Sequence, residues 1–441
     1  MRYFILILFI GCIASANAQT GFTLSECIDY TLNNHPTLSV YENNRSIAKA
    51  QSSQSVASYL PQVTGSANFT DNLKLQTTIL PAGTFGPEPA EVQLGTQFNT
   101  VVGVDFSQTI YDQSKITGIK AGKPYEAMTK YQEELNKEVI TYNTAKAYFQ
   151  VLTFKEQLSL LYSNQEKYEE MLSVLQYQFE KGVVLQKDVD RAKVNLNSIN
   201  YQIEDATTKE QLALNTLKNT MGMPLDSTLL VQEAIDYELF ATADMHNDLS
   251  LERLTEVQIN KKQIELQEIN LQMQKAKFSP TLDFVGKYGS QALSQDFDDA
   301  FSDWRSFSYV GISLKLPLFT GFKRSSQVKE EKLNLENELT NFEINKRDLK
   351  LRFENAQTSV GTAYSSFQSN RDNMQLSKKL LDVTEYQYQQ GVASLTDYLN
   401  DDTAYKTAQT NYINSLYNLM VTQLDYQKSQ GSLLQFINTI K

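Results

Sequence analysis

The sequence has few of the residues that build metal sites and covalent catalysis. Its 441 residues include two cysteines and two histidines, His35 and His246. Cysteine and histidine do not cluster along the chain, which argues against a zinc site and against a His-dependent catalytic triad. We therefore expect no catalytic residue, no bound metal and no cofactor.

Carboxylates are plentiful but form no recognisable acid–base pattern. The adjacent pairs Asp298-Asp299 and Asp401-Asp402 stand in polar stretches. We interpret both pairs as solvated, because general acid–base chemistry needs carboxylates in a defined and shielded constellation. An enzymatic function is disfavoured for that reason.

Long hydrophobic runs are missing beyond the N-terminus, which argues against a transmembrane helix there. At the N-terminus, Arg2 precedes a short apolar stretch, residues 3–10, and Ala16-Asn17-Ala18 fits a small-x-small cleavage site. We predict that residues 1–18 are a signal peptide and that the protein is exported. Membrane insertion of such a chain would take the form of a barrel or of peripheral attachment.

Cys12 allows a second interpretation of the same segment. It follows Gly11, and an exported protein with a cysteine in that place can be lipidated, although Phe9-Ile10 is a poor lead-in for lipidation. Cleavage after residue 18 would leave Cys27 as the single cysteine, so no intramolecular disulfide could form. We expect Cys27 at a packed apolar position on a helix.

Positive charge is also in deficit. The chain has 40 Lys and Arg against 51 Asp and Glu, a formal net charge of −11. A negative chain gains no electrostatic attraction to phosphates, which argues against nucleic acid and against acidic lipid as partners.

What the sequence does contain is an internal duplication. Several features recur in the same order in the two copies. The offset is 219 residues for the pair Pro61 and Pro280 and about 208–209 residues from Val102 onward. The two offsets differ because the first copy has a longer loop between its strands, which contains Pro81, Pro87 and Pro89. The matched pairs are Pro61 with Pro280, Val102-Gly103-Val104 with Val310-Gly311-Ile312, Gly182 with Gly391, Asp188 with Asp397, and Met221-Gly222 with Gln430-Gly431.

Each copy has the same predicted elements: a helix, two strands, a very long helix, a glycine-led turn and another helix. The first repeat, 19–222, has helices at 23–58, 114–180 and 186–220 and strands at 62–71 and 98–111, with its turn near residue 182. Residues 223–248 link the copies. The second repeat, 249–441, has helices at 249–278, 322–389 and 395–429 and strands at 281–290 and 306–319, with its turn near residue 391 and a C-terminal tail.

The long helices carry coiled-coil seams. Apolar residues recur along these helices at steps of three and four. Polar residues interrupt the pattern at Gln165 in the helix 114–180 and at Asp402, Gln409 and Gln423 in the helix 395–429. The three seams are Leu158, Leu161, Tyr168, Leu172, Leu175 and Phe179; Ala192, Leu196, Ile199 and Ile203; and Leu395, Tyr398, Tyr405, Tyr412, Leu416, Leu419 and Tyr426. Core stripes of an ordinary bundle are the alternative, but helices of about 65 residues span about 100 Å, far beyond a compact domain.

The four strands alternate apolar and polar residues, as in Val310, Ile312 and Leu314 against Gly311 and Ser313. Such alternation suits a membrane barrel with a wet lumen, or a half-buried sheet of a soluble domain; the export signal and the four strands favour the barrel. Four strands cannot close a barrel, and an open edge in lipid leaves backbone groups unpaired. The pattern therefore implies oligomerisation.

Three groups of residues resemble the TolC-type outer membrane efflux protein family over nearly the whole mature chain. They are the Asn-rich step 32–38 with its proline, the sequence Leu316-Pro317-Leu318-Phe319 followed by Gly321, and the two turns Phe179-x-x-Gly182 and Tyr388-x-x-Gly391, each with an Asp six residues past the glycine.

The resemblance implies a homotrimer in which twelve strands form one transmembrane β-barrel and twelve helices form an α-barrel. The strands would enter the barrel at Pro61, Pro280 and Pro317. The barrel would lie in the outer membrane of a Gram-negative bacterium and the helices in the periplasm. The partners it implies are a periplasmic adaptor protein (membrane fusion protein), an inner-membrane transporter of the RND or ABC type, and outer-membrane lipid.

The resemblance also places functional residues at the periplasmic tip. Asp397 and Asn400 map to an acidic ring at the aperture. Asn400 departs from the family, which has an acid there; the neighbouring acid, Asp401, points about 100° away. Tyr388 and Asp188 map to a bonded pair that holds the tip shut. A solvated helix-start role for Asp397 and a packed aromatic role for Tyr388 stay open.

The tip turns themselves consist of Gly182 and Val183 in the first copy and Gly391 and Val392 in the second. The glycines permit a positive φ between antiparallel helices, and the turns would contact the adaptor. The family's tip arginine is replaced by Ala393, so one closing constraint is missing.

The function that follows is an outer-membrane exit duct of a tripartite efflux pump or a type I secretion system, a passive conduit gated at its tip. The alternative is a trimeric coiled-coil structural or adhesive envelope protein without a lumen, against which the proline-led strand pairs argue. The adaptor itself is a further alternative, but adaptors carry one hairpin and a lipoyl-like domain rather than two copies with four strands.

Overall fold

The computed structural model describes residues 21–83, 86–232 and 249–439. The predicted signal peptide with Cys12, His246 and residues 233–248 of the predicted link lie outside the described residues. The chain divides into two compact units. Unit 1 takes the described residues of Met1–Glu42, Tyr131–Gln258 and Ile344–Lys441, and unit 2 takes those of Asn43–Lys130 and Ile259–Glu343.

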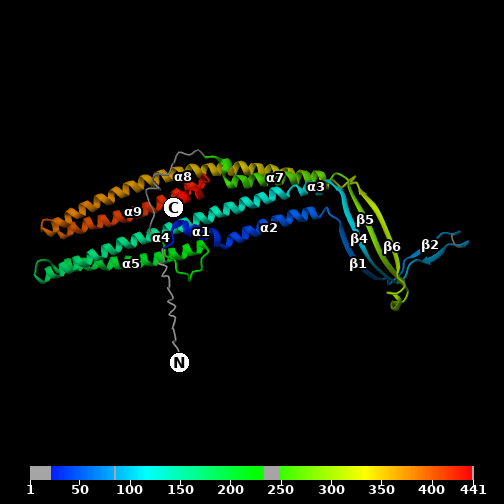
Figure 1. Ribbon diagram of the computed structural model, residues 1–441, viewed down its shortest axis with the longest axis horizontal. Coiled ribbons are helices and arrows are strands. Elements are labelled where there is room, and N and C mark those ends of the chain that lie inside the picture. Colours follow the sequence, from blue (N-terminus) through cyan, green and yellow to red (C-terminus); the bar gives the residue numbers. More distant parts are fainter. Residues whose placement is uncertain (1–20, 84–85, 233–248, 440–441) are drawn as a thin grey trace, which may run out of the picture. The chain divides into compact units, whose positions relative to one another are not determined.

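The same order of elements occurs twice (Figure 1). The first copy has α1 (Leu24–Asn34), α2 (Pro36–Ala57), β1 (Gln62–Asp71), β4 (Phe98–Asp112), α3 (Gln113–Ile119), α4 (Gly122–Glu180) and α5 (Gln186–Met221). The second copy has α7 (Thr255–Ala276), β5 (Thr281–Ser294), β6 (Arg305–Lys315), α8 (Lys323–Gln389) and α9 (Leu395–Ser429), followed by α10 (Leu433–Thr439). The chain is therefore mostly helical with four long strands, as predicted. No described helix is both long and apolar enough to cross a membrane.

Local sequence sets the helix ends. Thr23 and Glu26 form a capping box at the start of α1, and Gly222 ends α5 in the left-handed region with φ 71°. His35 is extended because the ring of Pro36 crowds the residue before it, and Pro36 then opens α2. The predicted helix 23–58 is therefore two helices.

The long strands of unit 2 form one antiparallel sheet in the order β1-β4-β5-β6 (Figure 1). The central pairing, β4 with β5, joins the two copies; it has a register shift between Thr109 and Tyr111. Residues that pair directly share a face, so the register places Phe106, Gly286 and Val310 on one face. This sheet contains the four strands that the sequence predicts.

Three features differ from the predicted elements. The last strand ends at Lys315, not at 319, because Pro317 has no N–H to donate to a ladder. β5 runs on to Ser294, beyond the predicted 290. The polar loop of the first copy holds a separate two-stranded sheet, β2 (Thr77–Leu80) with β3 (Ala90–Gln93), which periodicity did not reveal because each strand has four residues.

The first long helix is also interrupted. The predicted helix 114–180 is divided into α3 and α4 by a turn at Lys120 and Ala121. The helix resumes at Gly122, where an added Cβ would lie 2.3 Å from the Ser52 hydroxyl of α2. Glycine at this position therefore lets two helices of unit 2 approach closely.

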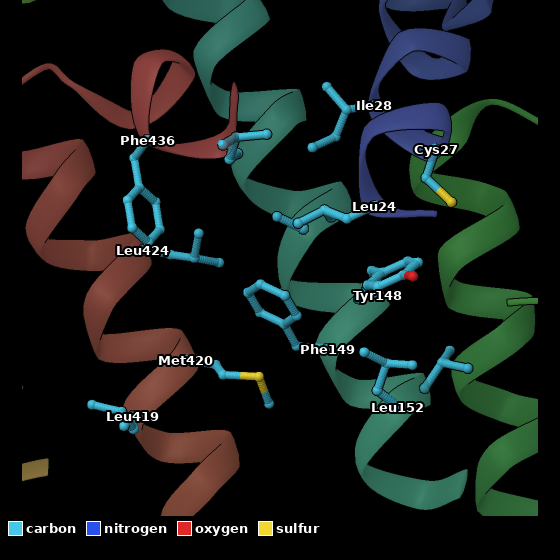
Figure 2. Close-up of a cluster of buried hydrophobic side chains, with 14 of the residues drawn as sticks. Leu24, Cys27, Ile28, Tyr148, Phe149, Leu152, Leu419, Met420, Leu424 and Phe436 are labelled. Atoms are coloured by element: carbon cyan, nitrogen blue, oxygen red, sulfur yellow. The ribbon is translucent and has the colours of Figure 1, made fainter. Parts of the chain in front are cut away.

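Unit 1 has its main core where α1, α4, α5, α8, α9 and α10 meet. Figure 2 shows Phe149 of α4 on the side of α9, where Met420 and Leu424 lie, and Tyr148 on the side of α5. The Tyr148 hydroxyl donates a 2.8 Å hydrogen bond to the Gln232 carbonyl. Cys27 is fully buried in this cluster, and burial raises the pKa of its thiol to about 12. It occupies the packed helical position expected of it.

Candidate functional site

Two glycine-led turns in unit 1 connect the long helices of each copy: residues 181–185 between α4 and α5, and residues 390–394 between α8 and α9. Gly182 and Gly391 have φ of 73° and 72°. Each glycine N–H bonds three residues back, to Phe179 and Tyr388, and the next residue bonds five residues back. Both turns are thus Schellman endings, in which a left-handed glycine terminates the helix.

The residue after each glycine is an exposed valine. Val183 is 71% exposed and Val392 is 78% exposed. Single exposed apolar side chains are common on protein surfaces and do not by themselves indicate a binding site. Contact of these valines with an adaptor stays a prediction.

The two aspartates six residues past the glycines both cap a helix. The Asp188 carboxylate accepts a 3.3 Å hydrogen bond from the Leu185 N–H at the start of α5. The Asp397 carboxylate accepts a 2.7 Å bond from the Ser394 hydroxyl at the start of α9, and this bond lowers the pKa of Asp397. Asp397 is exposed. Asp397 therefore caps the start of α9 in the single chain. The predicted role at the aperture would be a second role of the same side chain.

Asn400 lies in an open groove between α5 and α9. The groove is lined by Lys187, Asp190, Arg191, Val194, Asn195, Thr396, Leu399 and Asn400. Arg191 donates a 3.4 Å hydrogen bond to the Thr396 hydroxyl, which joins the first hairpin (α4–α5) to the second (α8–α9). An arginine on the first hairpin thus makes a link between the hairpins, although position 393 holds alanine.

Tyr388 is a packed aromatic in the single chain. Its ring stacks on Tyr398 at 5.7 Å between centroids, and burial, followed by the charge of Asp188, raises the pKa of its phenol. In the described part of the chain, no hydrogen bond joins the Tyr388 hydroxyl to Asp188. The predicted Tyr388–Asp188 pair therefore stays a prediction.

Sequence reasoning missed a polar group deeper in the same four helices. Asp402 is 4% exposed, so its interpretation as half of a solvated pair was wrong. It accepts a hydrogen bond from the Tyr168 hydroxyl of α4 and an ion pair from Lys406 at 2.9 Å. Its neighbour Asp401 is also engaged, accepting a 2.5 Å bond from Thr384 of α8. Asp298 and Asp299 are exposed, as interpreted.

The signal for these contacts lay in the breaks of the seams. Asp402, Gln409 and Gln423 interrupt the apolar pattern of α9, and all three are buried. Gln409 accepts a 3.2 Å bond from Asn164 of α4, which is also buried, so the seam of α4 runs through Asn164 and not through Gln165. Asp402 and Gln409 thus have partners on the facing helix α4, whereas among the described residues the buried Gln423 side chain has no hydrogen-bond partner.

The sheet of unit 2 has two chemically different faces. One face carries exposed apolar residues: Val63, Phe69, Val102, Val104, Tyr288, Val310, Ile312 and Leu314. The other face carries Asp105, which pairs with Lys287 at 3.1 Å and accepts a 3.2 Å bond from Ser66. The faces can therefore meet two different media, one apolar and one aqueous.

The prolines assigned to the barrel entry lie at strand ends. Pro61 directly precedes β1 and Pro280 directly precedes β5, whereas Pro317 follows the end of β6 by two residues. All three lie outside the hydrogen-bonded ladders, where the missing N–H costs nothing.

The sequence model of the family described as "Outer membrane efflux protein" matches residues 27–223 and 248–431. Outer membrane protein TolC of Escherichia coli K12 is 23% identical over 363 residues, which are 76% of this chain and 70% of that protein. TolC of Vibrio cholerae serotype O1 is 21% identical over 437 residues, 95% of this chain and 92% of that protein. The crystal structure of the Campylobacter jejuni CmeC outer membrane channel superposes with a TM-score of 0.72 at 19% identity, covering 93% of this chain and 86% of that chain.

Proposed function

Because this chain belongs to the outer membrane efflux protein family, we propose that it is an exit duct, a passive channel across the outer membrane that serves a tripartite efflux pump or a type I secretion system. The observation that carries the proposal is the sheet of unit 2, which has an exposed apolar face, a polar opposite face and two outer edges. Among the described residues, no strand pairs with the outer edge of β1 or of β6.

Assembly follows from those edges. Each unpaired backbone group in hydrocarbon costs several kcal/mol, so the edges need partners of the same kind. The outer edge of β6 in one copy would pair with that of β1 in the next. Three copies, the number that the family resemblance implies, would give a twelve-stranded barrel with the apolar face toward lipid and Asp105 and Lys287 toward water.

The helical part would extend into the periplasm and close at its tip. Asp397 and Asn400 are exposed beside each other on α9, and three copies would bring three Asp397 carboxylates near one axis, where they attract cations. Val183 and Val392 would contact a periplasmic adaptor, which in turn engages an inner-membrane transporter of the RND or ABC type. Adaptor binding would draw the α8–α9 hairpin outward and widen the tip.

Single-channel recording in planar bilayers tests this proposal. Purified protein should give discrete, long-lived, cation-selective conductance steps. A trimeric envelope protein without a lumen would bind the bilayer or remain in solution without any such steps. Fractionation of the cells supplies the second arm, because recovery with soluble periplasmic proteins would contradict an outer-membrane channel.

A further inference from the structure

A layer of polar side chains crosses all four long helices of unit 1, well inside the hairpins and away from the glycine-led turns. We call it the polar layer. Its members are Tyr168 of α4, Asn195 of α5, Thr384 of α8, and Asp401, Asp402 and Lys406 of α9.

The centre of the polar layer is a closed triangle of contacts. The Tyr168 hydroxyl donates to Asp402, the Lys406 ammonium lies 2.9 Å from the same carboxylate, and that ammonium also lies 3.7 Å from the centre of the Tyr168 ring. Tyr168 is 3% exposed and Asp402 is 4% exposed. The Asn195 side chain of α5 lies beside the Tyr168 hydroxyl. Every member of the triangle is therefore satisfied in this one arrangement.

The polar layer holds α9 from two sides. Successive helical residues point about 100° apart, so Asp401 and Asp402 address different neighbours. Asp401 accepts from Thr384 of its own hairpin at 2.5 Å, whereas Asp402 accepts from Tyr168 of the other hairpin. The position of α9 along both neighbouring helices is thus fixed at one level.

Apolar clusters lie on either side of the polar layer in the sequence of α4 and α5. Leu175, Val189 and Ala192 form the cluster toward the turns, with Leu395 packed against it. Leu158, Leu161 and Ala206 form the cluster on the other side. Apolar contacts alone tolerate sliding of one helix along another, but a buried polar group finds its partner in a single register.

We propose that the polar layer is a register lock between the two hairpins: it holds α9 in place against α4 and so keeps the tip of the conduit closed. This inference rests on the proposed function. Moving α9 along α4 by one turn would carry the Asp402–Lys406 ion pair away from Tyr168 and leave the buried Asp402 carboxylate without the hydrogen bond from that hydroxyl, which is unfavourable. The hairpins therefore change between discrete arrangements rather than sliding gradually.

The central test removes one group at a time. Tyr168→Phe deletes only the hydroxyl, and Asp402→Asn deletes only the charge. The matched control is Asp382→Asn, because Asp382 forms a 2.9 Å ion pair with Lys378 within α8 and both side chains are about half exposed. In bilayer recordings, we expect Tyr168→Phe to raise the open probability about tenfold, because it removes the whole hydrogen bond to a charged group that joins the hairpins. Asp402→Asn should raise it less, because the neutral amide oxygen can still accept a hydrogen bond from Tyr168. Asp382→Asn should leave it unchanged.

A second readout follows the register directly and does not depend on conduction. With a bifunctional maleimide whose spacer is about as long as an arginine side chain, Arg191→Cys and Thr396→Cys should cross-link readily in the wild-type background, because the Arg191 side chain reaches across to hydrogen-bond Thr396 at 3.4 Å. Adding Asp402→Asn should slow this cross-link and raise cross-linking of Val194→Cys with Thr396→Cys. Asp382→Asn should alter neither rate.

If one of the single variants fails to fold, replacing all three residues of the triangle keeps the proposal testable. Tyr168→Phe, Asp402→Leu and Lys406→Leu together leave no buried charge unpaired, and such replacements usually keep a protein folded. We expect this triple variant to fold, to conduct with high open probability and to cross-link in more than one register. Wild-type open probability together with wild-type cross-linking in all these variants would overturn the lock. Absence of any wild-type conductance would instead overturn the proposed function, while the cross-linking still decides the lock.

Discussion

Gly182 and Gly391 occupy the same position in the two copies: each ends a long helix in the left-handed region, with φ of 73° and 72°. An added Cβ would meet nothing within 4 Å at either glycine. The constraint at both turns is therefore the backbone conformation and not the space around it.

The first prediction concerns these turns. Gly391→Ala should lower the free energy of unfolding by about 1 kcal/mol, because a left-handed conformation is unfavourable for any residue with a Cβ. Gly361→Ala in the interior of α8 is the matched control, since its Cβ also meets nothing within 4 Å. It should raise stability by about 0.5–1 kcal/mol. Denaturant unfolding of the two variants measures both effects, and equal signs would contradict this account of the turn.

The second prediction separates the two roles of Asp397. Asp397→Asn should reduce cation selectivity and block by multivalent cations, because it removes the charge proposed to lie near the axis. Ser394→Ala removes the 2.7 Å capping bond and keeps that charge. It should weaken the start of α9 by about 1 kcal/mol and leave selectivity unchanged. If Asp397→Asn leaves selectivity and block as they were, the aperture assignment is wrong.

The third prediction tests which face of the sheet meets lipid. Ile312 and Ser313 are adjacent on β6 and point to opposite faces. Ile312→Arg should impair folding into lipid vesicles by up to about 2–4 kcal/mol, since a charge on the lipid face is unfavourable and its cost is greatest at the midplane. Ser313→Arg should fold nearly as well as the wild type, because its side chain would enter water. A reversed order would mean that the polar face meets lipid.

The sequence predicted secondary structure best where the apolar–polar pattern was regular over many residues or where proline and glycine marked an end. β1 and both turn glycines lie where alternation, proline and glycine placed them, because those signals depend on local backbone chemistry alone. Asp402 was misjudged because its burial depends on Tyr168, a residue 234 positions away in the chain. β2 and β3 were missed because four-residue strands contain too few alternations to stand out from a polar loop.

The fourth prediction concerns pH and a carboxylate on α4. Burial, and then the nearby charge of Glu256, raise the pKa of Glu138 from 4.5 to about 7, although Lys428 and Arg352 oppose the shift. A raised pKa means that the folded chain favours protonated Glu138. Its contribution to stability is complete below pH 4.5 and is lost as pH rises through about 7.

Glu138→Gln mimics the protonated form at every pH. The variant should melt at the same temperature as the wild type near pH 4.5 and at a higher temperature near pH 8. Glu134→Gln, at an exposed position one turn earlier on α4, serves as the control. A melting difference between wild type and Glu138→Gln that does not change with pH would contradict the raised pKa.

The central claim is that the strands of a single chain are completed by copies of the same chain around an aqueous pore. Native mass spectrometry of the protein extracted from membranes in mild detergent tests it most directly. The account predicts one dominant species with three times the mass of the mature chain. A particle with the mass of one chain, folded and stable in the same detergent, would contradict it.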